Sequence, residues 1–139
     1  MRRRHRGTGQ ALLETAIVLP VMVVLMLGFL AILIRIEAQV ELETATSLAA
    51  AAAVSAPANS PQSVVNAQDT WRGTLHQYVY LRPGTLSQSC GPYQPGQTVV
   101  CTGTATLDYG QTPMGLIVPG PPIQLSSTAT ARGSPYRST

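Results

Sequence analysis

An acidic residue, Glu14, stands five positions after Gly9, where a long apolar run begins. If that run crosses a membrane, an ionised carboxylate near the bilayer centre is unfavourable by about 2.5 to 3.5 kcal/mol on insertion scales, and by less near the interface. Glu14 therefore either reaches back to the headgroups or pairs with a positive group, and the second possibility would make it a functional residue.

The other titratable residues form no catalytic or metal-binding pattern. Asp69 and Asp108 are isolated in the sequence, and the remaining acids follow the apolar run closely. His5 and His76 are far apart, whereas a metal site usually needs three or four ligands. The sequence also lacks a glycine-rich phosphate loop. We therefore expect neither an enzyme nor a bound metal or cofactor.

The apolar run itself predicts one transmembrane helix. Residues 16–34 contain no charge, and as a helix they span about 28 Å, close to the thickness of a bilayer core. Four of the nine arginines precede the run, at positions 2, 3, 4 and 6, whereas Arg35 is followed by three acids. The positive-inside rule then predicts a cytoplasmic N-terminus and an exterior C-terminus.

A secretory signal peptide is the competing interpretation of this region. Its apolar segment usually has 7–15 residues and is followed closely by a cleavage site of small residues. Here the apolar run is longer, and the small residues Val54, Ser55 and Ala56 come some twenty positions later, directly before Pro57. We therefore favour a retained membrane helix.

The helix is expected to continue outside the membrane to about residue 56, because residues 35–56 contain neither Gly nor Pro. Pro20 removes one backbone hydrogen bond and should bend or loosen the helix locally.

Glu37 and Glu41 are either a solvated acidic face or a contact with basic groups of a neighbouring subunit. A narrow stripe at helical spacing is suited to close helix packing: Ile36, Val40, Thr44, Ser47 and Ala51.

Two parts of the sequence resemble one family. The stretch from Gly9 and Gln10 to Glu14, followed by Val18-Leu19-Pro20, resembles the N-terminus of TadE-like pseudopilins, small proteins of tight-adherence (Flp-type) pilus systems. Residues 104–109 and 123–132 resemble the ending of that family, whereas residues 57–96 have no counterpart in it.

The resemblance implies processing and assembly. In type IV prepilins a membrane aspartyl peptidase cuts after the glycine on the cytoplasmic side, which here would separate Gly9 from Gln10. Removal of this leader, residues 1–9, would leave five basic and six acidic residues, a net charge of −1 in place of +3. The basic charge then belongs to the leader, and nucleic-acid binding is not expected. Glu14 and Pro20 would act in assembly with other pilin subunits.

The exterior region, residues 57–132, is expected to form a small domain that makes the fold class α+β. A second helix would open near Pro61 and bury one side, formed by Val64, Gln68, Trp71, Leu75 and Tyr78. Residues 82–84, Arg-Pro-Gly, would end it. Two strands would follow, at 99–109 and 123–132, joined by a proline-rich connector at 113–122. Residues 133–139 would be a loose tail.

Cys90 and Cys101 are the only cysteines, and the predicted topology places both outside the cytoplasm. A disulfide between them is therefore expected.

The resemblance thus implies a minor pilin or pseudopilin, a single-pass protein of the cytoplasmic membrane that a prepilin peptidase processes and that can end in an extracellular filament. An uncleaved membrane protein with a small exterior binding domain is the alternative. A pseudopilin of a secretion or competence apparatus is a third possibility.

Overall fold

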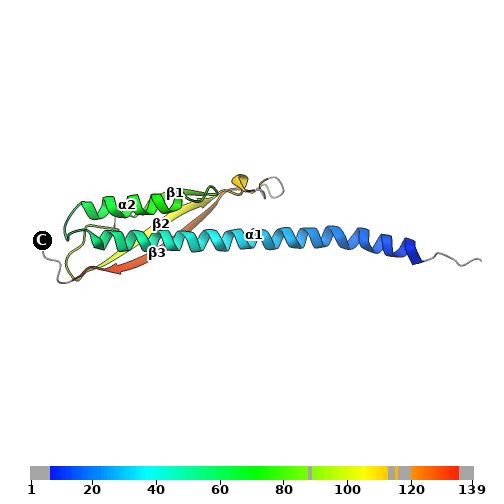
Figure 1. The fold of residues 1–139 in the computed structure, drawn as a ribbon, viewed down its shortest axis with the longest axis horizontal. Coiled ribbons are helices and arrows are strands. Elements are labelled where there is room, and N and C mark those ends of the chain that lie inside the picture. The colour runs from blue at the N-terminus through cyan, green and yellow to red at the C-terminus, as the bar shows by residue number, and fades with distance from the viewer. Residues whose placement is uncertain (1–6, 88, 113–114, 116–119, 135–139) are drawn as a thin grey trace, which may run out of the picture. The chain divides into compact units, whose positions relative to one another are not determined.

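The computed structural model describes residues 7–87, 89–112, 115 and 120–134, and the chain divides into two compact units between Ile34 and Arg35 (Figure 1). Parts of the predicted leader, connector and tail lie outside the described residues. The elements follow in the order α1 (Gly7–Ser55), α2 (Gln62–Leu75), β1 (Leu81–Leu86), β2 (Thr98–Leu107), a 3-10 turn at Tyr109–Gln111, and β3 (Ile123–Arg132). The α+β class is confirmed.

The N-terminal unit consists of the first part of α1. Its most apolar window has a mean hydropathy of 3.1, and none of that window is buried within the protein. Pro20 lies inside α1, which continues through it as a helix. Among the described residues α1 is the one helix that is long and apolar enough to cross a membrane.

From Arg35 onward α1 buries one side within the C-terminal unit. Most of the buried side chains are small: Ala38, Leu42, Ala45, Thr46, Ala49, Ala50 and Ala53. They leave room for strand β2, since a Cβ added at Gly103 would lie 2.8 Å from Thr46 Oγ1 and 2.8 Å from Trp71 Nε1. The alanines therefore favour the helix by their propensity and also allow close approach of a strand.

The buried side of α2 differs in part from the predicted one. Trp71 and Leu75 are buried as expected, but the other two buried positions are Ser63 and Ala67 rather than Val64 and Gln68. Tyr78 lies beyond the end of α2. A small residue is buried at position 63 because the backbone at Gly91 passes close to it. A Cβ added at Gly91 would lie 2.7 Å from Ser63 Oγ.

The sheet has three antiparallel strands in the order β1-β2-β3, so the prediction of two strands was wrong. The additional strand, β1, contains the Arg-Pro-Gly sequence that was expected to end the second helix. Pro83 is tolerated because β1 is an edge strand, and the register shifts between Pro83 and Leu86. At Gly84 an added Cβ would lie 2.7 Å from the Thr104 carbonyl oxygen, so only glycine fits.

The two predicted strands are present as β2 and β3. β3 has the predicted bounds, and its alternate residues from Ile123 to Ala131 form the more buried face. β2 ends at Leu107 rather than at Tyr109, because Asp108 accepts a hydrogen bond from the Gly110 amide at 3.0 Å and starts the 3-10 turn.

Candidate functional site

The predicted cleavage bond, between Gly9 and Gln10, lies at the beginning of α1, which starts at Gly7. The first four amide groups of a helix have no intrahelical acceptor, and Gln10 is the fourth residue of α1. The bond is therefore in the part of the helix that is held by the fewest hydrogen bonds. A peptidase that binds extended backbone has the least structure to open there.

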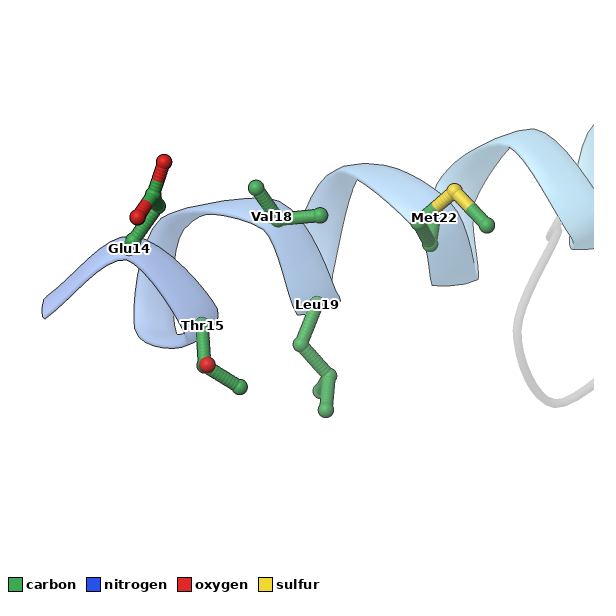
Figure 2. A pocket seen from close by; sticks show the side chains of 5 residues that line it. All are labelled: Glu14, Thr15, Val18, Leu19 and Met22. Carbon is green, nitrogen blue, oxygen red and sulfur yellow. The ribbon is translucent and has the colours of Figure 1, made fainter. Parts of the chain in front are cut away.

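Glu14 lies one turn further along, at the edge of an open apolar surface (Figure 2). It borders a shallow hollow on the helix surface together with Thr15, Val18, Leu19 and Met22. Figure 2 shows the side chains of Glu14 and Val18 on one edge of the helix, with Thr15 and Leu19 pointing to the other. Among the described residues no cation forms an ion pair with Glu14.

The stripe predicted for helix packing is exposed within the C-terminal unit. Ile36 and Val40 are 55% and 52% exposed, and Thr44, Ser47 and Ala51 are also exposed. Thr44 Oγ1 donates to the Val40 carbonyl oxygen at 2.9 Å, and Ser47 Oγ donates to the Thr44 carbonyl oxygen at 2.8 Å. Because both hydroxyls are satisfied within α1, the stripe presents mainly carbon atoms.

The acidic pair on α1 has partners that the sequence did not suggest. The pKa of Tyr78 is raised above its ordinary value, mainly through hydrogen bonding to the nearby Glu41 carboxylate. Burial, together with the negative charge of Glu37 and a hydrogen bond to it, raises the pKa of Tyr80 to about 12. The two tyrosine rings lie 6.1 Å apart between their centroids, tilted by 55°. Glu37 and Glu41 thus lie near two tyrosines that follow α2.

The predicted disulfide between Cys90 and Cys101 is present, and both residues are buried. Their Cα atoms are 4.5 Å apart, and the bridge ties the loop after β1 to strand β2. In the chain-entropy model a loop of this length is stabilised by roughly 3 kcal/mol. For a domain this small, that is a large share of the total stability.

Tyr93, inside the loop that the disulfide closes, was not identified from the sequence. It is 2% exposed, and its hydroxyl lies 2.9 Å from the Val54 carbonyl oxygen and 2.8 Å from that of Ala56. Carbonyl groups at the end of a helix lack intrahelical partners, so Tyr93 satisfies the end of α1. The sequence feature that could have identified Tyr93 is its position in a loop that is rich in Gly and Pro and lies between two cysteines.

The remaining titratable residues are separated in the part of the chain that the structure describes. No three His, Cys, Asp or Glu side chains there come together as a metal site. His76 is exposed, and His5 lies outside the described residues. Arg82 Nη2 and Asp108 Oδ2 are 2.8 Å apart and join the start of β1 to the segment after β2.

Comparison of this chain with family models, with curated proteins and with solved structures finds no match.

Proposed function

We propose that the protein is a minor pilin or pseudopilin of a tight-adherence-type pilus. Its α1 helix crosses the cytoplasmic membrane with the N-terminus inside, a prepilin peptidase cuts between Gly9 and Gln10, and the mature subunit assembles with other pilin subunits through α1. The observation that carries the proposal is the spacing of Gly9 and Glu14 at the beginning of a helix whose apolar surface is not buried by any of the residues that the structure describes.

The exterior position of the C-terminal unit is supported by its chemistry. Arginines precede the apolar run, and three acids follow Arg35 within nine positions. The disulfide belongs to the same unit, and such bonds persist in oxidising compartments outside the cytoplasm. Charge and redox chemistry thus support the same orientation.

Glu14 gives the proposal a mechanism for register. Cleavage creates an α-ammonium group at Gln10, four residues before Glu14. Pairing of Glu14 with the α-ammonium group of a neighbouring subunit offsets the unfavourable burial of the carboxylate, estimated at about 2.5 to 3.5 kcal/mol at the bilayer centre. Because both groups must lie at one depth, the pair sets the axial offset between subunits. The exposed stripe on α1 then provides a smooth surface for contact further along.

Processing is tested by the intact mass of protein extracted from the membranes of cells with a working prepilin peptidase. We expect the wild-type chain to begin at Gln10. The variant Gly9→Trp should keep its leader, because a bulky side chain blocks the peptidase, whereas Gly7→Trp should still be cut. A wild-type protein that retains Arg2 to Arg6 would support the uncleaved membrane protein instead.

Assembly is tested separately with Glu14→Val. This variant should insert and be cut normally, yet fail to enter filaments or to copurify with other pilins. Thr15→Val is the control, since it introduces the same valine one position away and keeps the carboxylate. Incorporation of Glu14→Val at the level of the control would rule out the pairing role.

A further inference from the structure

The loop that the disulfide closes, residues 90–101 and called here the cysteine loop, folds back on the end of α1. Inside it, the buried Tyr93 places its hydroxyl 2.9 Å from the Val54 carbonyl oxygen and 2.8 Å from that of Ala56. The Asn59 amide donates to the Tyr93 carbonyl oxygen at 2.9 Å. Tyr93 is therefore bound through both its side chain and its backbone to the segment in which α1 ends.

Other contacts hold the cysteine loop against two further elements of the C-terminal unit. The Gly133 amide, directly after β3, donates to the Gln97 carbonyl oxygen at 3.0 Å. The Gly133 backbone also packs on the Tyr93 ring, where an added Cβ would collide with the ring carbons. A Cβ added at Gly91 would lie 3.0 Å from the amide nitrogen of Val64, in the first turn of α2. The loop thus joins the end of α1, the start of α2 and the end of β3.

These contacts enclose the disulfide itself. Cys90 and Cys101 are both buried. Reduction of a disulfide begins when a thiolate attacks one of its sulfur atoms. A thiolate reaches buried sulfur atoms only after the surrounding segment opens locally. The rate of reduction therefore reports how often the cysteine loop leaves its place.

We propose that the cysteine loop is a thiol-sensitive clasp on α1. The disulfide holds Tyr93 on the end of α1, and Tyr93 in turn keeps the disulfide covered. The reductant is a dithiol: one of its sulfur atoms forms a mixed disulfide with a cysteine, and its second sulfur atom then resolves that bond. Two electrons and two protons pass from the dithiol to Cys90 and Cys101, which become thiols, while the dithiol becomes a disulfide.

Reduction has a structural consequence at the end of α1. Without the bridge the two ends of the cysteine loop are no longer joined, so Tyr93 is held less firmly at the carbonyl groups of Val54 and Ala56. Carbonyl groups at a helix end have no intrahelical partner, and the last turn opens more readily when it loses its cap. The clasp lies entirely within the C-terminal unit and depends on neither processing nor membrane crossing.

The first test measures the rate at which dithiothreitol reduces the full-length protein in detergent, with new thiols alkylated and counted by mass. Tyr93→Phe keeps the ring and removes the hydroxyl. We expect it to be reduced about 2- to 10-fold faster than the wild type, the range that corresponds to the loss of one hydrogen bond. Tyr78→Phe, the same change outside the cysteine loop, should be reduced at the wild-type rate.

A further variant separates local opening from unfolding of the whole unit. Leu42 is buried in α1 and has no place in the cysteine loop, so Leu42→Ala weakens the core without removing a contact of the clasp. Its rate of reduction should stay near that of the wild type. Equal rates for Tyr93→Phe and Tyr78→Phe would overturn the proposal, and so would a larger increase in Leu42→Ala than in Tyr93→Phe.

The converse test measures amide hydrogen exchange along α1 after the cysteines of the wild-type protein have been reduced and alkylated. We expect exchange in the last turn of α1, residues 52–55, to rise by about 2- to 10-fold, the effect of losing the Tyr93 hydrogen bond. Exchange at Leu42 and Ala45 should be unchanged. Unchanged exchange in the last turn would contradict the release of α1. An equal rise at all these positions would mean that reduction unfolds the whole unit, which also overturns the clasp.

Discussion

The two parts of α1 differ in the size of their apolar side chains. The first part exposes large ones, and the second part buries small ones. Before Ile34 the helix presents large apolar side chains, such as Met22 and Phe29, which are 61% and 61% exposed. After Arg35 its buried side is mostly alanine, packed closely under a strand. A helix surface that no other segment approaches closely tolerates bulky side chains, whereas the surface that a strand approaches at Gly103 requires small residues.

The sharpest test of this comparison is one substitution made in both parts. Leu42 is fully buried and Leu25 is 64% exposed. Leu42→Ala should lower the unfolding free energy of the C-terminal unit by about 2 to 5 kcal/mol, through lost burial and the cavity left behind. Leu25→Ala should leave it unchanged. Denaturant unfolding of the full chain in detergent, followed by Trp71 fluorescence, measures both. Equal effects would show that the two parts are not energetically distinct.

The close approach of β2 to the helices is tested at glycine. Gly103→Ala introduces a Cβ 2.8 Å from Thr46 Oγ1 and Trp71 Nε1, and should destabilise the C-terminal unit by about 1 to 3 kcal/mol through overpacking. Gly73, in α2, has open space around it. Gly73→Ala should therefore stabilise the unit by about 0.5 to 1 kcal/mol, because alanine favours helix. The same unfolding measurement applies, and a stable Gly103→Ala protein would contradict the tight layer.

The smallest expected effect concerns Tyr80, which lies between α2 and β1 and is close to Glu37 of α1. Tyr80 has its pKa raised to about 12, above the ordinary 10.0. A raised pKa means that the folded protein favours the protonated hydroxyl, so this stability is complete below pH 10 and is lost as the pH rises through about 12. The chain has no lysine to titrate in that window. The absorbance of tyrosinate should show a late step that Tyr80→Phe removes, and an unchanged titration in that variant would refute the contact.

Local patterns in the sequence were sufficient for several elements. The uncharged run predicted the apolar helix because length and composition alone determine whether a helix can span a bilayer. The strand β3 was predicted with its bounds because alternation of polar and apolar residues is a local signal. The disulfide followed from there being one possible pair of cysteines and an exterior topology.

The sequence by itself thus determined the apolar helix, the α+β class, β3 and the pairing of the cysteines. The tertiary structure alone decided that Arg82-Pro83-Gly84 forms an edge strand, because an edge position tolerates the missing amide of proline. It also decided that Ser63 and Ala67 face inward, and that Tyr78, Tyr80 and Tyr93 bind acidic or carbonyl groups of α1. These features depend on which segments approach one another in space, and spacing along the chain carries no record of that.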